Sequence, residues 1–366
     1  TPIDERNHTV ELTTLGWDPY FEHAFEPYAH DGLVPARVAS ENREHYLLYW
    51  QGGELVGQVS GRFAHRSADR AAFPAVGDWV AASPRPEEGR AAIVAVLPRK
   101  TAFSRKAWGS VTEEQVVAAN IDSALIVSSL DRNFQLRRIE RYLTLAWESG
   151  AEPAIVLNKA DLCPEAEARR ADVEAVAMGV PIHVISATSG DGIDVLRQYL
   201  QPGRTVTLLG SSGVGKSTII NALLGADRLR VNAVRARDDK GRHTTTHREM
   251  VLFPDGGIVI DNPGMRELQL WADEEAVTDV FQEIEALAAA CRFRDCQHEQ
   301  EPGCAVRRAL EDGTLDPARY ANYLGLKREL RFLASRQDQR ARQEQREQSK
   351  RIAKWTRQRE KAGTLR

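Results

Sequence analysis

Cysteine and long apolar runs are the scarcest features of this 366-residue sequence. Four cysteines are present, and three of them lie between Cys291 and Cys304. Such a small, clustered set excludes a disulfide framework and indicates a reducing compartment with a metal site. No apolar run approaches the length that spans a bilayer, and the first residues carry no signal-peptide pattern. We therefore expect a cytoplasmic protein with no membrane association.

A strong net charge is also missing, although the charge is unevenly distributed. The chain as a whole carries −3. Residues 327–366 contain 14 Lys and Arg against 5 Asp and Glu, a balance of +9, so the rest of the chain carries −12. A basic tail on an acidic body suggests a polyanionic partner for the tail.

The first part of the chain has the pattern of a small β-barrel. Residues 1–32 give only weak signals, but residues 33–97 consist of short alternating stretches separated by turns such as Gly52-Gly53. Many short strands with glycine turns are typical of small barrels. The pattern does not distinguish an OB-fold from an SH3-like barrel.

The middle of the chain, from about Asn120, alternates between strands and helices. We expect a helix over 136–149 that ends at Gly150, and a second helix that follows a glycine-rich loop and ends at Gly225. This alternation predicts a mostly parallel sheet covered by helices. After Trp271 the pattern is helical, with the cysteine cluster. Buried strands are expected at 121–130, 154–157, 182–185, 205–209 and 257–260.

One segment matches the phosphate-binding loop GxxxxGK[ST]: Gly210, Ser211, Ser212, Gly213, Val214, Gly215, Lys216 and Ser217. It follows an expected strand and opens an expected helix, which is the context that the motif requires. Backbone N–H groups and the helix N-terminus, which includes Thr218, would hold phosphate oxygens. Lys216 is expected to reach the β- and γ-phosphates, and the Ser217 hydroxyl to bind Mg²⁺. The alternative is an ordinary glycine-rich turn.

Two further motifs indicate that the base is guanine. Asn158-Lys159-Ala160-Asp161 follows an expected strand, and Asp161 can accept the N1–H and 2-amino hydrogen bonds that adenine cannot offer. Lys159 is expected to lie along the base, and Asn158 to hold neighbouring loops. Ser186 and Ala187, after the next strand, would support the Asp161 loop and the guanine carbonyl. Taken alone, the first motif also occurs by chance and the second is a polar turn.

Two loops are candidates for sensing the γ-phosphate. In Asp261-Asn262-Pro263-Gly264, Asp261 is placed to hold Mg²⁺, directly or through water, and the Gly264 N–H to bond the γ-phosphate. A threonine of the loop 238–247 would complete the Mg²⁺ coordination; Thr245 is favoured, with Thr244 as the alternative. A surface turn and a solvated polar loop are the competing interpretations.

The cysteine cluster has the spacing of a zinc site. Cys291, Cys296, His298 and Cys304 form the pattern C-x4-C-x-H-x5-C. Three thiolates and one imidazole satisfy tetrahedral Zn²⁺ and leave no open position for water, so the metal is expected to be structural. The competing interpretation is buried cysteines beside a surface histidine. Cys163 is left over and is expected to be a packed thiol.

The order of the motifs is rotated. P-loop GTPases ordinarily present the phosphate loop first and the NKxD and Ser-Ala motifs last, whereas here those two precede the phosphate loop. Each motif still ends a strand, so a circularly permuted chain can build the same sheet. This order, the barrel-like N-terminus and the cysteine cluster together resemble the RsgA (YjeQ) family of bacterial GTPases that depend on the small ribosomal subunit. The resemblance covers roughly residues 33–330.

The resemblance implies a multidomain fold. Its parts would be an N-terminal extension (1–32), an OB-fold β-barrel (33–100), a circularly permuted P-loop α/β GTPase domain (112–272), a mostly helical zinc-binding domain (273–330) and a basic C-terminal tail (331–366). The ligands implied are GTP/GDP, Mg²⁺ and one structural Zn²⁺. Nothing in the sequence requires more than a monomer.

The resemblance further implies a late assembly factor that binds the small ribosomal subunit and its rRNA, and whose GTP hydrolysis the subunit stimulates. His243 stands where the family has a proposed catalytic histidine; an exposed loop histidine is the alternative. Met265 replaces the water-orienting Gln of Ras-like enzymes, so slow intrinsic hydrolysis is expected. Candidate RNA contacts are the basic residues of the tail and, on the barrel, Arg62, His65, Arg66 and Arg70.

Two other functions stay open on the sequence alone. An RNA-binding assembly factor could use the nucleotide as a conformational ligand with incidental turnover, and Met265 is compatible with that role. A P-loop ATPase or nucleotide kinase is the other alternative, and the motif that ends in Asp161 argues against it.

Overall fold

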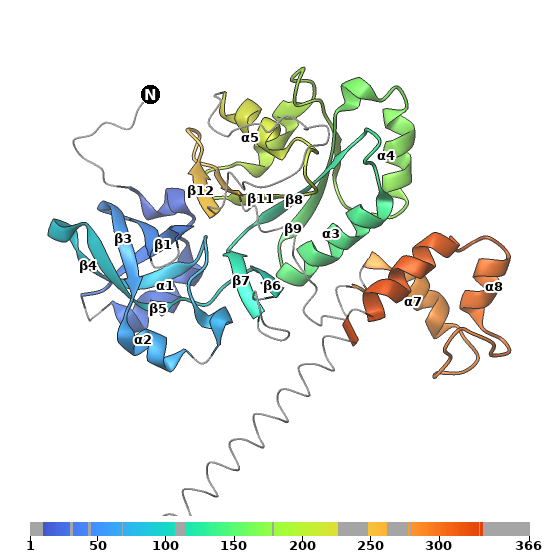
Figure 1. The fold of residues 1–366 in the computed structure, drawn as a ribbon, viewed down its shortest axis with the longest axis horizontal. Helices are drawn as coiled ribbons and strands as arrows, with labels where there is room; N and C mark the ends of the chain where they lie inside the picture. The colour runs from blue at the N-terminus through green and yellow to red at the C-terminus, as the bar shows by residue number, and fades with distance from the viewer. Residues whose placement is uncertain are drawn as a thin grey trace, which may run out of the picture.

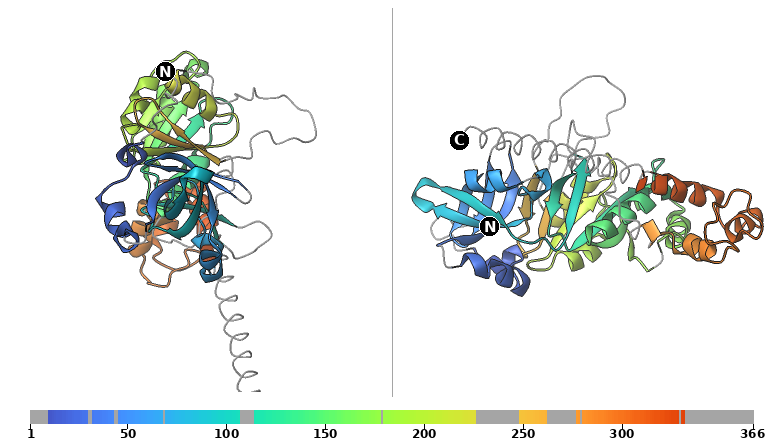
Figure 2. Two further views of the ribbon diagram at one scale, coloured as in Figure 1. Left: turned by 90° about the vertical axis from the view of Figure 1, so that its left-hand side faces the viewer. Right: turned by 90° about the horizontal axis from the view of Figure 1, so that it is seen from below.

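The computed structural model describes residues 10–29, 32–42, 45–67, 69–106, 114–177, 179–225, 248–261, 277–278, 280–328 and 330–331. Three parts follow one another along the molecule (Figures 1 and 2). A barrel lies at one end, an α/β part in the middle, and helices around the cysteine cluster at the other end. Within the ranges given above, no helix has both the length and the apolar character needed to cross a membrane.

Five short strands close into the barrel: β1 (Val34–Glu41), β2 (Tyr46–Trp50), β3 (Gly53–Val59), β4 (Trp79–Arg85) and β5 (Arg90–Val96). They pair in the order β1-β2-β3-β5-β4, and β4 pairs again with β1. β3 and β5 are parallel, and α2 (Gly61–Arg66) lies between β3 and β4 in the chain. This strand order and helix position identify an OB-fold rather than an SH3-like barrel.

The α/β part is a six-stranded sheet in the order β10-β9-β8-β11-β13-β12. All neighbours are parallel except β12 and β13. β8 and β11 are buried along their whole length, as expected for strands covered on both faces. The strands are β8 (Ser123–Ser129), β9 (Glu152–Asn158), β10 (Ile182–Val184), β11 (Thr205–Leu209), β12 (Arg248–Leu252) and β13 (Ile258–Asp261).

The helices that flank this sheet include α3 (Leu136–Ser149), α4 (Ala166–Glu174) and α5 (Lys216–Leu224). The predicted helix over 136–149 and the predicted strand over 205–209 are confirmed with the same bounds. Both predicted helix ends are confirmed as well, because Gly150 and Gly225 adopt left-handed backbone conformations as C-caps.

The barrel and the α/β part share one continuous sheet. β12 pairs with β13 on one edge and with β1 of the barrel on the other, so that eleven strands form one hydrogen-bonded sheet. The β1–β12 contact is antiparallel and short, with Ser40 opposite Glu249 and Glu41 opposite Arg248. The hairpin of β6 (Ala102–Lys106) and β7 (Glu114–Ala119) lies along the chain between the two parts.

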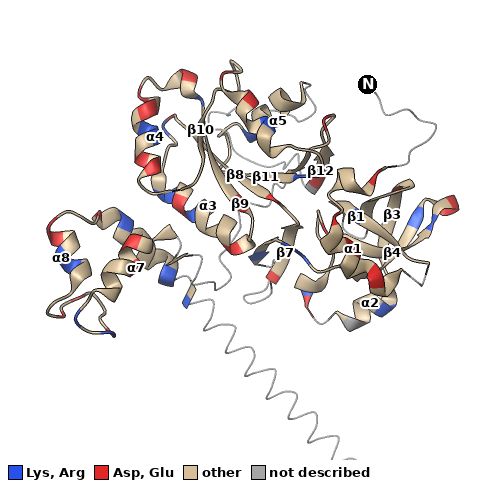
Figure 3. Ribbon diagram, turned by 180° about the vertical axis from the view of Figure 1, so that it is seen from behind, with Lys and Arg blue, Asp and Glu red and all other residues tan. Residues whose placement is uncertain are grey.

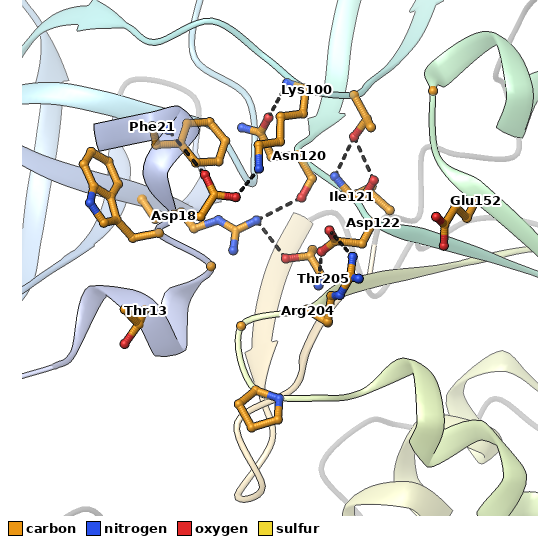
Figure 4. A pocket seen from close by; sticks show the side chains of 17 residues that line it. Thr13, Asp18, Phe21, Lys100, Asn120, Ile121, Asp122, Glu152, Arg204 and Thr205 are labelled. Atoms are coloured by element: carbon orange, nitrogen blue, oxygen red, sulfur yellow. Dashed lines mark hydrogen bonds and ion pairs between the residues drawn. The ribbon is translucent and has the colours of Figure 1, made fainter. Parts of the chain in front are cut away.

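An N-terminal segment reinforces the same junction. It consists of η1 (Leu12–Leu15), α1 (Pro19–Phe25) and η2 (Glu26–Tyr28). Trp17 packs edge-on against the fully buried Trp79 of the barrel, with ring centroids 4.7 Å apart. A cavity of about 470 Å³ lies between this segment and the N-terminal ends of β8, β9 and β11 (Figure 4). Arg37 lines this cavity. Its guanidinium donates to the N-terminal segment, to the barrel and to the α/β part.

The C-terminal part contains α7 (Gln282–Ala289), α8 (Ala305–Glu311) and a helix over 317–328. The prediction of a mostly helical region is confirmed for the described residues. This part contacts helix α3 of the α/β part through Arg319. The Arg319 guanidinium is bonded to Glu140 of α3 and to Glu283 of α7. Asn322 donates to the other Glu140 oxygen at 2.6 Å. Glu140 is 2% exposed, so the contact is a buried polar interface.

Candidate nucleotide and metal sites

The phosphate loop begins where β11 ends and closes where α5 begins. Gly210, Gly213 and Gly215 have φ values of 152°, 80° and 100°, a region that side-chain-bearing residues rarely adopt. Lys216 folds back so that Nζ donates to the Gly210 carbonyl at 2.7 Å and to the Ser211 carbonyl at 2.9 Å. The turn thus combines a glycine-rich backbone, the N-terminus of α5 and an ammonium, which are the groups that bind phosphate.

Asn158 joins this loop to two others. Its Nδ2 donates to the Val214 carbonyl at 2.8 Å, and its Oδ1 accepts from the Ala187 N–H at 3.0 Å. These two bonds are the contacts that the expected role of Asn158, to hold neighbouring loops, requires. A Cβ on Gly215 would overlap the Asn158 amide nitrogen, so this close approach requires glycine.

Asp161 and Ser186 meet at the same edge of the sheet. The Ser186 hydroxyl donates to Asp161 Oδ1 at 2.6 Å, which leaves Oδ2 available to another donor. Asp161 follows β9, Ser186 follows β10 and Gly210 follows β11. The carboxyl ends of neighbouring parallel strands gather their loops at one edge, where open α/β sheets bind ligands.

Asp261 ends β13, the strand beside β11. Ile260 is paired with Thr207, and the Thr207 hydroxyl donates to the Ile260 carbonyl at 3.0 Å. The two strands therefore bring Asp261 to the edge that also carries the phosphate loop. The predicted residues His243, Thr245 and Gly264, together with Thr244 and Met265, lie outside the described residues.

One acidic residue at this edge, Asp131, was not predicted as a site residue from the sequence. Asp131 follows β8, and its Oδ2 lies 2.8 Å from Lys159 Nζ. The available signal was its position after a buried strand, the same signal that marks Asp161 and Asp261. A lone Asp after a strand is also a common turn residue, so the sequence did not single it out.

The four predicted metal ligands lie together. Their ligand atoms, three Sγ and one ring nitrogen of His298, are all within 4.8 Å of one another. Cys291 Sγ is 3.9 Å from Cys304 Sγ and 3.6 Å from His298 Nδ1. The fourth cysteine, Cys163, is partly buried against the main apolar core, as expected for a packed thiol.

The barrel residues considered for RNA contact lie on one short stretch. Arg62 and His65 are exposed on α2, Arg66 ends that helix, and Arg70 is exposed in η3 (Arg70–Ala72). Elsewhere along the described chain, Lys and Arg positions are interspersed with Asp and Glu positions in the ribbon of Figure 3. The basic residues of the tail from 332 onward lie outside the described residues.

Comparison with known proteins places these sites in a family. A family model described as RsgA GTPase matches residues 96–271. A model described as ABC transporter matches residues 193–357, a stretch that contains the phosphate loop but not the motif that ends in Asp161. The motif that ends in Asp161 thus falls only within the match to the first model.

Several relatives match nearly the whole chain. A protein of Opitutus terrae named Small ribosomal subunit biogenesis GTPase RsgA is 50% identical over 361 residues, 96% of this chain and 98% of that protein. A protein of the same name from Syntrophotalea carbinolica is 48% identical over 88% of this chain and 90% of its own length.

Solved structures agree in fold. YjeQ from Thermotoga maritima has a TM-score of 0.61 at 29% identity and covers 81% of this chain and 98% of its own. YloQ, described as a circularly permuted GTPase, has a TM-score of 0.57 at 22% identity, over 83% of this chain and 97% of its own. The resemblance is thus confirmed, and with it a GTP hydrolase that uses guanine nucleotide and Mg²⁺ and acts in ribosome biogenesis. The chain belongs to the RsgA family of small ribosomal subunit biogenesis GTPases.

Proposed function

We propose that the protein is a late assembly factor of the small ribosomal subunit, and that the subunit stimulates it to hydrolyse GTP to GDP and phosphate. The names of its relatives support the ribosomal partner. The observation that carries the proposal is the pair of hydrogen bonds made by Asn158. Because they join the base loop to the phosphate loop, one guanine nucleotide can lie across both.

The described residues divide the work of binding this nucleotide. Asp161 reads the guanine edge, with Ser186 and Ala187 supporting it, while Lys159 lies along the base. The loop from Gly210 to Thr218 holds the phosphates, with Lys216 neutralising charge that develops on the β- and γ-phosphates. Ser217 and Asp261 are the proposed Mg²⁺ ligands, and the metal supplies further charge neutralisation when bound.

Three further roles rest on the sequence. Thr245 would complete the Mg²⁺ coordination, the Gly264 N–H would bond the γ-phosphate, and His243 would orient the attacking water. With Met265 in place of a water-orienting Gln, turnover without the subunit is expected to be slow.

The cysteine cluster is proposed to hold one structural Zn²⁺. Bonds of about 2.0–2.3 Å in a tetrahedral site separate neighbouring ligand atoms by about 3.5–3.8 Å. The distances from Cys304 Sγ to His298 Nδ1, 3.5 Å, and from Cys291 Sγ to His298 Nδ1, 3.6 Å, fit that requirement. Two backbone N–H groups, of Ala305 and Arg307, point at the sulfurs of Cys291 and Cys304 and would stabilise thiolates.

The remaining parts of the proposal concern partners and place. The subunit's rRNA would contact the barrel and the tail through phosphate-binding side chains. A ribosomal partner implies action in the cytoplasm, and the protein is proposed to work as a monomer.

Hydrolysis assays with purified subunits test this function. We expect small subunits to raise GTP turnover by about tenfold or more, a barrier reduction of about 1.4 kcal/mol or more. Large subunits and ATP are the controls, and neither is expected to replace small subunits or GTP. Equal GTP turnover with and without small subunits would contradict the proposal.

The Lys216→Ala variant separates the proposed function from its nearest alternative. A timer that needs hydrolysis predicts that this variant fails to mature subunits. A protein that uses nucleotide only as a conformational ligand predicts that maturation continues at GTP concentrations that saturate the variant, which a nucleotide titration establishes.

A further inference from the structure

The segment from the end of β8 to the first turn of α3, residues 129–138, contacts both loops of the nucleotide site. Asp131 Oδ2 lies 2.8 Å from Lys159 Nζ, and Arg138 Nη1 donates to the Ser211 hydroxyl at 3.1 Å. Lys159 belongs to the base loop, and Ser211 belongs to the phosphate loop. No motif in the sequence marks Asp131 or Arg138, and none of the nucleotide roles above uses them.

Asp131 is itself held in place. Its Oδ1 accepts from the Ser129 hydroxyl at 2.8 Å and from the Asn133 N–H at 2.9 Å. These two donors fix the carboxylate plane and turn Oδ2 toward Lys159. Burial works to raise the pKa of Asp131, but the hydrogen bonds from Lys159, Asn133 and Ser129 outweigh it and hold the pKa below its ordinary value. The carboxylate is therefore ionised at neutral pH.

Lys159 is fixed at both ends by this arrangement. Its backbone has a φ of 66°, the left-handed region that residues other than glycine rarely adopt. The neighbouring Ala160 N–H donates to the Ile185 carbonyl at 3.1 Å, and Asn158 is bonded to two loops. With Nζ held by Asp131, the four-carbon stem between these anchors has lost much of its rotamer freedom before any base is bound.

Arg138 fixes the other loop in a comparable way. Its second terminal nitrogen, Nη2, donates to Gln135 Oε1 at 2.9 Å, which orients the guanidinium. Nη1 then holds the Ser211 hydroxyl, and the carbonyl of the same Ser211 accepts from Lys216 Nζ. Arg138 therefore restrains Ser211, the residue whose carbonyl accepts a hydrogen bond from Lys216.

We propose that Asp131 and Arg138 are positioning residues of the nucleotide site, Asp131 for the lysine along the base and Arg138 for the phosphate loop. The inference rests on the proposed function, in which Lys159 covers the base. Ordering these groups in advance removes an entropic cost that binding would otherwise carry. The base contact is common to GDP and GTP, so loss of Asp131 is expected to weaken both nucleotides alike.

Dissociation of fluorescent GDP and GTP analogues from the full-length protein tests the role of Asp131. Asp131→Asn removes the charge and keeps the shape, and we expect both analogues to leave about three- to tenfold faster. In a Lys159→Met background, Asp131→Asn is expected to add nothing, because its partner ammonium is already gone. Asp172→Asn, the same change at an exposed α4 position, is the control and is expected to leave both rates unchanged.

A double-mutant cycle with Ser211 tests the role of Arg138. Arg138→Ala is expected to raise KM for GTP by more than it lowers kcat, and Arg138→Lys to recover part of that loss. In a Ser211→Ala background, Arg138→Ala is expected to add little. Additive effects in this background would show that Arg138 does not act through Ser211 and would remove it from the proposal.

Two outcomes for Asp131 are decisive. Wild-type dissociation rates in Asp131→Asn, or an undiminished effect of that change in the Lys159→Met background, would overturn its positioning role. Melting temperatures of all variants identify any loss of folding. If the wild-type protein bound no guanine nucleotide, the proposed function would fail. If the wild type bound guanine nucleotide and the variants released it at the wild-type rate, the proposed function would stand and only this inference would fall.

Discussion

At the scale of single residues, Asn158 makes the contacts on which the nucleotide site depends. One amide serves the Val214 carbonyl and the Ala187 N–H, in two different loops. Both partners lie at buried positions, so neither can turn to water when the amide is removed. An unpaired buried group of this kind costs about 1–3 kcal/mol.

Asn158→Ala is therefore expected to weaken guanine-nucleotide binding by about ten- to a hundredfold, since each 1.4 kcal/mol is a factor of ten. Titration with a fluorescent GDP analogue measures the effect. Asn42→Ala, at an exposed position at the end of β1, is the control and is expected to bind as the wild type does. Unchanged affinity in Asn158→Ala would mean that the loops are held together without this side chain.

The sequence predicted this site unevenly, for a physical reason. Residues inside contiguous motifs could be found, because phosphate and guanine impose fixed spacings on the backbone that binds them. Asp131 and Arg138 could not be found, since their partners lie 28 and 73 residues away and neither pair forms a spaced pattern. Side-chain contacts between loops depend on strand order, which only the structure provides.

At the scale of elements, Arg319 holds the C-terminal helices to α3. It is bonded to Glu140 and Glu283, and its Nη2 donates to the Val280 carbonyl at 2.8 Å. Glu140 is only 2% exposed, so removal of Arg319 would leave a buried carboxylate without its counter-charge. Such losses typically cost 3–5 kcal/mol.

Arg319→Ala is accordingly expected to lower the free energy of unfolding by about 3 kcal/mol or more, and to make the C-terminal helices easier to cleave. Denaturant titration and limited proteolysis measure the two effects. Arg307→Ala removes an exposed i,i+4 partner of Glu311 and is expected to change stability by about 0.5 kcal/mol or less. Equal effects of both changes would contradict a buried interface at Glu140.

Metal content tests whether the cysteine cluster beside α7 and α8 holds zinc. One Zn²⁺ per chain is expected to be released on thiol modification and detected with a colorimetric chelator. Cys296→Ser is expected to abolish this stoichiometry and to loosen the helices, because structural zinc is part of the folding free energy of such a region. Cys163→Ser is the matched control, expected to keep one zinc. A wild-type chain without zinc would remove the metal from the proposal.

Elements with strong local signals were predicted well, and elements without them were missed. The helix at 136–149 has one buried stripe and a glycine stop, both readable from sequence. The β6–β7 hairpin and the N-terminal helical turns were not predicted. Residues 10–29 mix aromatic and polar residues without a clear period. Trp17 and Phe21 pack on each other and on Trp79 of the barrel, a contact that no local pattern indicates.

At the scale of the whole molecule, Arg37 joins the N-terminal segment, the barrel and the α/β part at the junction cavity. Its guanidinium donates to the carbonyls of Leu15, Gly77 and Asn120 and to the Thr205 hydroxyl. Burial lowers its pKa to about 10, with Asp122 and Asp78 opposing that shift, so it remains charged at neutral pH.

Arg37→Met keeps roughly the same volume but leaves two buried carbonyls, those of Leu15 and Asn120, without a donor, each worth about 1–3 kcal/mol; the Gly77 carbonyl keeps a hydrogen bond from Asn120 Nδ2. We expect unfolding to separate into two transitions, one for the barrel and one for the α/β part, in differential scanning calorimetry. Arg85→Met, at a side chain 69% exposed at the end of β4, is the control and is expected to melt as the wild type does. A single unshifted transition in Arg37→Met would show that the shared sheet alone couples the two parts.

The overall arrangement was predicted only in outline. Alternation of strands and turns indicated a barrel but left its topology open, because the identity of paired strands is not encoded in a period-two pattern. The pairing β3–β5 and the closure β4–β1 decided the OB-fold. No local signal indicated that the barrel continues the α/β sheet.

That continuity has a mechanical consequence. Glu249 faces Ser40 of the barrel on one side and Asp261 on the other, so a single strand separates the barrel from the residue proposed to hold Mg²⁺. A torque on the barrel loads the two backbone pairs at β1–β12 and tends to tilt β12, and with it the neighbouring end of β13. A rigid polymer that pushes on the barrel would therefore displace the end of β13 that carries Asp261. In this arrangement the barrel acts as a lever arm and β12 as its pivot.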